Sequence, residues 1–372
     1  MGKAQKNAKG SKRFNLALQG GGSHGAFTWG VLDRILQDPA LDIDSISGAS
    51  AGAMNAVVLA DGWMKNGREG ARDALRCFWT RVGEAARSSP LQRGPLGKWF
   101  NDWSLDSSPA YIYFDMVTRL ASPYDLNPAN IHPLRDILAE QVNFKAVRDC
   151  GDIGLHISAT NVETGRIEVF NRKELSVEHI LASACLPTLF QAVEIDGVPY
   201  WDGGYMGNPP LFPLFDNADS DDVIIVQINP IVRKGAPRKA REILNRLNEI
   251  TFNASLLREL RAIDFVTRLL DTGRLDGTGY RRVLVHMISQ EQELCGFGAS
   301  SKLNAEGAFL KLLFDKGYET ADSWLGTHAE TIGKRSSVNL RELFSGDEDP
   351  LGADRLTRQA QFEQRAQRDA AE

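Results

Sequence analysis

The spacing of apolar and polar residues predicts strands and helices in alternation over the first sixty residues. Residues 13–18 form an apolar segment that predicts a strand, and apolar residues at helical spacing from Ala26 onward predict an amphipathic helix. Residues 44–47 predict a second strand, and residues 51–59 predict a second helix directly after it. This alternation is typical of an α/β domain with a parallel sheet.

The strand pattern stops at Asp61 and does not return until after about residue 141. Helices are predicted over 68–84 and 133–141, and the stretch between them is rich in aromatic residues: Trp99, Phe100, Trp103, Tyr111, Tyr113 and Phe114. We expect residues 61–141 to form a helical cap on the sheet. Its aromatic side chains would either pack on the core or form a wall or lid over a binding site.

Strands and helices alternate again in the second half of the chain. Strands are predicted over 153–159, 167–170, 198–201, 222–228 and 281–288, and helices over 238–271 and 305–325. The strand over 222–228 contains the apolar run Val223-Ile224-Ile225-Val226, as in a fully buried parallel strand. The charged and apolar faces of 238–271 fit either a helical layer on the sheet or a contact between two subunits.

These elements predict a three-layer α/β/α fold with a mainly parallel central sheet. The expected organisation is a flexible basic tail (1–12), a catalytic domain (13–230), a C-terminal helical extension with a late strand (231–344) and a charged tail (345–372). The extension is expected to pack on the catalytic domain.

The composition is that of an ordinary globular protein. Of 372 residues, 42% are hydrophobic and 24% are charged, and the formal net charge of −5 gives no reason to expect nucleic-acid binding. The four cysteines, Cys77, Cys150, Cys185 and Cys295, are widely spaced without a C-x-x-C pair, which predicts neither a disulfide framework nor a zinc site. No run of 18 apolar residues is present.

The N-terminal segment is polar and basic, with Lys3, Lys6, Lys9, Lys12 and Arg13. It lacks the apolar stretch of a secretory signal, so we expect a cytoplasmic protein. The tail is either simply flexible or a weak tether to a membrane surface, since each basic residue contributes about 1 kcal/mol near anionic lipid.

A glycine run, Gly20-Gly21-Gly22-Ser23-His24-Gly25, stands between the first strand and the first helix. Such a turn leaves backbone N–H groups unpaired, and these can bind a phosphate or an oxyanion, for which one well-placed donor contributes about 3–4 kcal/mol. The run also satisfies G-x-G-x-x-G, with Asp42 and Asp44 about 20 residues later, as in a dinucleotide-binding module.

The next strand ends in Gly48-Ala49-Ser50-Ala51-Gly52, which reads G-x-S-x-G. A serine between small residues at a strand-to-helix turn is typical of a nucleophile elbow. Asp202 follows another short strand and precedes two glycines, where its carboxylate could accept the proton of Ser50. A dinucleotide-binding domain needs neither motif, so together they favour a serine hydrolase.

The glycine run, G-x-S-x-G and D-G-G, in this order, resemble the patatin-like phospholipase family. Residues 159–165, 182–187 and 195–197 resemble it as well, and the likeness covers about residues 14–228. The resemblance implies a lipid acyl hydrolase of the phospholipase A or lysophospholipase type, without metal or cofactor. Carried onto this chain, it implies the following site: Ser50 as nucleophile flanked by Gly48 and Gly52, Asp202 as general base, and backbone amides among Gly20, Gly21, Gly22 and Ala51 as the oxyanion hole.

One position departs from the family pattern. The family commonly has Arg or Lys where this chain has His24. A cation there would help to hold a developing negative charge or a lipid phosphate, whereas histidine is mostly neutral near pH 7. His24 is therefore either an accessory residue of the site or a residue that only caps the loop, and neutral esters and polyesters join phospholipids as candidate substrates.

Two alternatives to a Ser–Asp hydrolase stay open. A Ser–His–Asp triad would need one of six histidines: His24, His132, His156, His179, His286 and His328. His286 falls in a predicted strand and His328 in a polar helical stretch, neither of which is the loop expected for a base. The other alternative is an inactive scaffold or nucleotide-binding module. The expected partner is a lipid or acyl ester, with peripheral membrane contact as an option, and the sequence leaves the oligomeric state undetermined.

Overall fold

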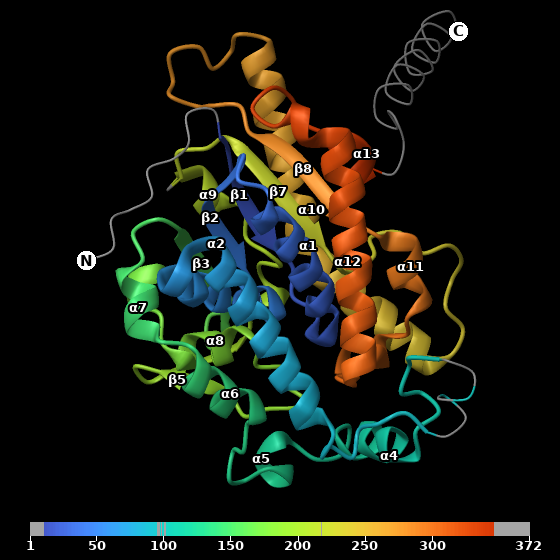
Figure 1. The fold of residues 1–372 in the computed structure, drawn as a ribbon. Coiled ribbons are helices and arrows are strands. Elements are labelled where there is room, and N and C mark those ends of the chain that lie inside the picture. The colour runs from blue at the N-terminus through green and yellow to red at the C-terminus, as the bar shows by residue number, and fades with distance from the viewer. Residues whose placement is uncertain (1–10, 95–96, 98, 100–101, 217, 346–372) are drawn as a thin grey trace, which may run out of the picture. The chain divides into compact units, whose positions relative to one another are not determined.

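A central sheet organises the computed structural model, which describes residues 11–94, 97, 99, 102–216 and 218–345 (Figure 1). The described strands are β1 (Lys12–Leu18), β2 (Leu41–Gly48), β3 (Gly154–Asn161), β4 (Ile167–Asn171), β5 (Val193–Ile195), β6 (Val198–Asp202), β7 (Asp222–Gln227) and β8 (Leu284–Ser289). They lie in the order β5-β6-β3-β2-β1-β7-β8, with β4 paired to β3.

The sheet is mostly parallel. β1 runs parallel to β2 and β7, β2 to β3, and β7 to β8, whereas the pairs β3–β4, β3–β6 and β5–β6 are antiparallel. Leu18 of β1 lies opposite Gly48 of β2. The carboxyl ends of these two strands therefore meet at one edge of the sheet, and the expected α/β fold with a mainly parallel central sheet is confirmed.

The buried strand expected over 222–228 is β7, and all its residues are buried. Helices and neighbouring strands cover parallel strands on both sides, so an apolar run such as Val-Ile-Ile-Val is needed there. β8 lies beside it, with Leu284 opposite Asp222. The late strand of the expected C-terminal extension thus belongs to the central sheet.

The longer helices lie where the pattern predicts them, the expected helix over 133–141 coincides with α6, and the short helices were not predicted. The described helices are α1 (Gly25–Gln37), α2 (Ala51–Ala86), α4 (Pro109–Val117), α5 (Pro123–Leu126), α6 (Pro133–Gln141), α7 (Phe144–Asp149), α8 (Val177–Ser183), α9 (Phe212–Asp216), α10 (Ala240–Asp271), α11 (Glu291–Gly296), α12 (Gly307–His328) and α13 (Leu340–Ser345). The helices expected over 51–59 and 68–84 are two halves of α2, interrupted at Asn66 and at Gly67, whose φ is 55°.

The aromatic residues of the expected cap region divide into two groups. Trp103 stacks on Phe309 of α12 with ring centroids 5.2 Å apart, and the Arg93 guanidinium lies 3.8 Å from the Trp103 centroid. Trp99 and Tyr113, by contrast, are 84% and 66% exposed. Trp103 therefore packs on the core, the exposed side chains do not, and Phe100 lies outside the described residues.

The chain divides into two compact units. One comprises residues 1–256 and 283–337 and holds every described strand, with α1, α2 and α12 packed together (Figure 1). The other comprises residues 257–282 and 338–372, and within it Asp264 forms ion pairs with Arg268 and Arg341.

The two expected tails lie almost wholly outside the described residues. Lys12 is an exception, since it begins β1 instead of ending a tail. Among the described helices, none combines the length and the apolar character that crossing a bilayer would require.

Candidate active site

Ser50 occupies the turn between β2 and α2. Its φ of 52° is strained for a residue other than glycine, and the strain is that of a sharp strand-to-helix turn. The turn is also crowded: a Cβ atom added at Gly52 would lie 2.2 Å from the Leu18 carbonyl oxygen, and one at Gly48 would lie 2.8 Å from the Gly52 carbonyl carbon. The G-x-S-x-G pattern thus reflects the close packing of this turn.

Ser183 forms a hydrogen bond with the backbone of the Ser50 turn. It is fully buried at the end of α8, and its Oγ accepts the N–H of Ser50 at 2.9 Å. Ser183 lies in the segment 182–187, which resembles the family, but no pattern in the sequence indicated a role for it.

Asp202 ends β6 and is fully buried. Its Oδ1 accepts the Gly204 N–H at 2.7 Å, while its Oδ2 has no hydrogen-bond partner of normal geometry among the described residues. Burial raises the pKa of Asp202 to about 7, although the Gly204 N–H and the Ser50 hydroxyl both oppose the rise. A carboxyl group with this pKa can both take and return a proton near neutral pH.

Neighbouring strands hold the backbone of Asp202. Asp202 lies opposite Ala159 of β3, its N–H donates to the Cys185 carbonyl at 2.8 Å, and its own carbonyl accepts the Thr160 hydroxyl at 2.8 Å. Because β3 also pairs with β2, Asp202 and Ser50 come from strands that share a neighbour. The pairing explains how residues so distant in sequence interact.

The glycine loop after β1 lies directly against the Ser50 turn. A Cβ atom added at Gly20 would lie 2.5 Å from the Ser50 Cβ. The N–H of Gly20 donates to Asn208 Oδ1 at 2.6 Å, so Gly20 cannot offer it to an oxyanion, which corrects one of the four expected donors. Within the described part of the chain, the N–H groups of Gly21, Gly22 and Ala51 have no acceptor.

A network of buried amide side chains lies behind the glycine loop. Gln19 Oε1 accepts the backbone N–H of Asn229 at 2.9 Å, and Gln19 Nε2 donates to Asn253 Oδ1 at 3.1 Å. Asn229 Nδ2 donates to the Gly20 carbonyl at 2.7 Å. This network was not predicted, because isolated Asn and Gln residues form no recognisable spacing pattern in the sequence and come together only in the fold.

His24 is buried in the 3-10 turn η1 (Gly22–His24), where it faces the turn η4 (Ala299–Leu303). Its Nε2 lies 2.7 Å from Ser301 Oγ, and the Ser301 hydroxyl donates to the Gly298 carbonyl, so the imidazole is the donor to Ser301. Burial lowers the pKa of His24 to about 3, with a further decrease from the nearby Lys302 ammonium. His24 is therefore neutral at physiological pH and supplies no cation.

The other histidines lie away from the two motif residues. His286 is indeed in a strand, and its Nε2 lies 2.9 Å from Asp222 Oδ1. His132 stacks on Phe190, and His179 Nδ1 accepts the N–H of Ser176. Among the described residues, none of the six histidines forms a hydrogen bond with Ser50 or Asp202.

The acidic residues that fit a dinucleotide fingerprint lie at the wrong end of β2. Asp42 is opposite Arg13 at the start of β1, whereas the glycine loop follows the end of β1. Asp44 forms an ion pair with Arg13 and accepts the N–H groups of Asp219 and Ser220. A ribose-binding acid belongs at the carboxyl end of the strand, so the geometry argues against the dinucleotide hypothesis.

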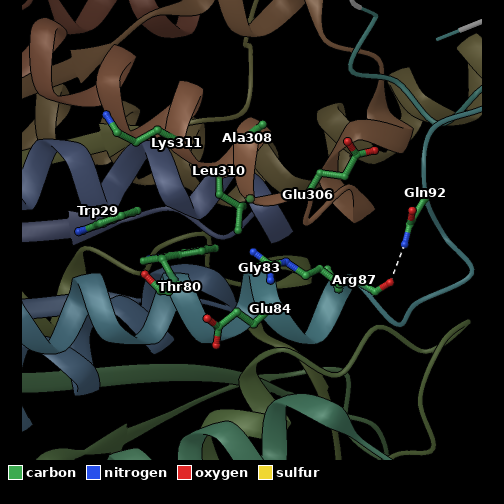
Figure 2. Close-up of a pocket in the computed structure, with 13 residues that line it drawn as sticks. Trp29, Thr80, Gly83, Glu84, Arg87, Gln92, Glu306, Ala308, Leu310 and Lys311 are labelled. Atoms are coloured by element: carbon green, nitrogen blue, oxygen red, sulfur yellow. Dashed lines mark hydrogen bonds between the residues drawn. The ribbon is translucent and has the colours of Figure 1, made fainter. Parts of the chain in front are cut away.

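A cavity of about 570 Å³ opens between α1, α2 and α12, as Figure 2 shows. Trp29, Arg87, Glu306 and Lys311 are among its lining residues, and Ser50 and Asp202 are not. The two motif residues therefore do not line this cavity. In the part of the chain that the structure describes, no group of three or more His, Cys, Asp or Glu residues could hold a metal ion.

Comparison with known proteins agrees with the motifs. A family model described as patatin-like phospholipase matches residues 16–215. No curated protein matches the chain significantly. Lys302 and the amide residue Asn229 lie beyond the matched residues.

Among solved structures, the chain is similar to VipD from Legionella pneumophila, with 14% identity over 84% of this chain and 67% of that one and a TM-score of 0.35. It is also similar to full-length ExoU, from the type III secretion system of Pseudomonas aeruginosa, in complex with SpcU. That match has 13% identity over 87% of this chain and 59% of the other, with a TM-score of 0.26.

Proposed function

The chain belongs to the patatin-like phospholipase family, and on this basis we propose that it hydrolyses acyl esters of lipids through a Ser50–Asp202 dyad. The observation that carries the proposal is the pairing of a strained serine turn with a buried carboxyl group. Asp202 Oδ2 lacks a hydrogen-bond partner of normal geometry among the described residues, and the Ser50 hydroxyl is one of the groups acting on the Asp202 pKa.

The proposed reaction has two steps. The Ser50 hydroxyl oxygen attacks the ester carbonyl carbon while its proton passes to Asp202, and the resulting oxyanion is bound by free N–H groups among Gly21, Gly22 and Ala51. Collapse of this intermediate breaks the ester bond, and the alcohol leaves with the proton from Asp202. Water then attacks the acyl-enzyme, again with Asp202 as base, and releases the fatty acid and free Ser50.

The proposed substrate class is a lipid ester. His24 leaves the position of the usual basic residue neutral, so this side chain does not select for a phosphate. Phospholipids and neutral esters are therefore the two substrate classes to compare.

Exposed apolar side chains around α4 and α5 support contact with a lipid surface. This lipid-facing segment is defined by Ile112, Tyr113, Met116, Leu120, Tyr124, Leu126 and Ile131, all exposed. An enzyme that takes its substrate from a bilayer needs such an apolar docking surface. We propose that these residues bind the membrane peripherally.

The test of the dyad is labelling with a fluorophosphonate, which reacts with an activated serine. Wild type, Ser50→Ala and Asp202→Asn are compared, the adduct is mapped by peptide mass spectrometry, and hydrolysis of phosphatidylcholine, lysophosphatidylcholine and p-nitrophenyl butyrate is measured. We expect one adduct on Ser50 and a loss of at least about 10³-fold in kcat/KM for both variants. Labelling of wild type should increase with pH around 7, since Asp202 must be ionised to act as a base.

Asp196→Asn is the matched control, because Asp196 is exposed on the neighbouring β5–β6 turn. It should label and hydrolyse like wild type. Full activity in Ser50→Ala, or labelling of a different serine, would refute the assignment. A mild loss in Asp202→Asn would return attention to a histidine base.

A further inference from the structure

Lys302 lies directly behind the glycine loop, although it is far from it in sequence. It belongs to η4, and a Cβ atom added at Gly22 would lie 2.4 Å from the Lys302 carbonyl oxygen. Its ammonium donates to Asn229 Oδ1 at 2.6 Å. A cation therefore stands next to the loop whose N–H groups we assign to the oxyanion hole.

Asn229 connects this cation to the loop. While its Oδ1 accepts from Lys302, its Nδ2 donates to the Gly20 carbonyl at 2.7 Å and to Gln19 Oε1 at 3.2 Å. Each polar atom of the side-chain amide has a partner, so its orientation is fixed. Asn229 is fully buried, and a hydrogen-bond chain in such surroundings is stronger than the same chain in water.

The hydrogen-bond chain from Lys302 ends at one peptide group, the one between Gly20 and Gly21. The Gly20 carbonyl and the Gly21 N–H belong to the same peptide group, so a hydrogen bond to that carbonyl increases the partial positive charge on that N–H. Gly21 is one of the expected oxyanion donors. The Gly20 N–H is held separately by Asn208.

We propose that Lys302, acting through Asn229, supplies the positive charge of the oxyanion hole by polarising the Gly20–Gly21 peptide group. This inference rests on the proposed function. Lys302 is a positioning and polarising residue and does not touch the substrate. It would take the electrostatic role of the Arg or Lys that the family commonly has where this chain has His24. Lys302 lies outside residues 16–215, the part of the chain that the family model matches.

The groups around Lys302 set the pH range of this effect. Burial lowers the pKa of Lys302 to about 8, Glu249 on α10 raises it, and Arg233 on the preceding loop lowers it. His24, on η1, is neutral at these pH values. Lys302 therefore carries its charge below pH 8 and loses it above, so activity should decrease on the alkaline side.

The experiment compares the pH profiles of kcat/KM for p-nitrophenyl butyrate, from pH 5 to 10, in four proteins. They are wild type, Lys302→Met, Lys302→Arg and the control Lys334→Met, whose ammonium is exposed and paired with Glu330. We expect a decrease in wild type with a midpoint near pH 8. Lys302→Met should lose about tenfold or more at pH 7.5 and show no such decrease. Lys302→Arg should keep activity at pH 10, because guanidinium stays charged.

The increase in activity with pH around 7, assigned to Asp202, should be the same in all four proteins. A Lys302→Met enzyme within twofold of wild type at pH 7.5 would overturn the inference. If that variant does not fold, an unchanged alkaline decrease in Lys302→Arg would overturn it as well. Failure of the proposed function is a different result. It would be seen if Ser50→Ala kept full activity or if the wild-type protein hydrolysed none of the esters, and either result would remove the basis of both proposals.

Discussion

The N–H of Ser50 donates to the hydroxyl oxygen of Ser183 at 2.9 Å, so α8 restrains the strained backbone of the Ser50 turn. Ser183 is fully buried. We expect this hydrogen bond to affect the orientation of the Ser50 hydroxyl more than substrate binding.

Ser183→Ala should therefore lower kcat by about tenfold while KM changes little, since a small misorientation of a nucleophile is costly. The free energy of unfolding should fall by about 1 kcal/mol, because the buried Ser50 N–H loses its acceptor. Steady-state kinetics and urea denaturation measure the two effects. An increase in KM with kcat unchanged would show that Ser183 shapes the substrate site instead.

Backbone strain at Ser50 predicts an unusual gain in stability. Its φ is 52° and its ψ is −121°, a region that glycine adopts readily and other residues do not. Ser50→Gly should be more stable than Ser50→Ala by about 1 kcal/mol in urea denaturation, although both lack the hydroxyl. Equal stability of the two variants would mean that the turn relaxes when the hydroxyl is removed.

Asp202 should make stability depend on pH in a defined direction. Its pKa is about 7 in the folded protein and about 4 in an unfolded chain, so the folded state binds the proton more tightly between these values. The cost of burying the charge therefore grows as pH rises from about 4 to 7 and is complete above 7. Asp202→Asn should raise the Tm clearly at pH 8 and much less at pH 5.

The control for this comparison is Asp196→Asn on the exposed turn, which should give the same small difference at both pH values. A stabilisation by Asp202→Asn that does not change with pH would contradict the buried charge as its cause.

His24 should not be needed as a charge. Its pKa of about 3 leaves it neutral throughout the range in which the enzyme would work, and the contacts of its ring include a hydrogen bond to Ser301 and edge contacts with Phe297 and Phe309. His24→Gln, which keeps a donor, should retain activity within about threefold and an unchanged pH profile. A lost or shifted limb of the profile would show that the imidazole titrates in the reaction.

The lipid-facing segment gives a prediction about binding without turnover. Tyr113 and Leu120 are 66% and 81% exposed, and their replacement by Ser should cost the core nothing. In the Ser50→Ala background, this double change should weaken sedimentation with phosphatidylglycerol–phosphatidylcholine vesicles by about tenfold, since each apolar side chain contributes about 1 kcal/mol or more. The matched control replaces Val232 and Tyr280, which are exposed elsewhere, and should leave vesicle binding unchanged.

The sequence by itself determined the order of strands and helices, the parallel buried strand at 222–228 and the places of Ser50 and Asp202. The spacing of apolar residues shows which face of a helix or strand is buried, and it is visible within a short segment of sequence. Helices and strands can therefore be predicted locally. The G-x-S-x-G pattern can likewise be recognised from five adjacent residues, and a Cβ atom at Gly48 would meet the turn's own backbone at Gly52. The need for glycine at position 52 comes from the Leu18 carbonyl of the neighbouring strand.

Only the tertiary structure decided which groups surround those two residues. Strand pairing through β3 connects Asp202 to the Ser50 turn, and the Gly20 N–H donates to Asn208. His24 is neutral because it is buried beside Lys302, a residue that is distant in sequence. Burial, pKa and hydrogen-bond partners depend on the three-dimensional surroundings, which no periodicity in the sequence records.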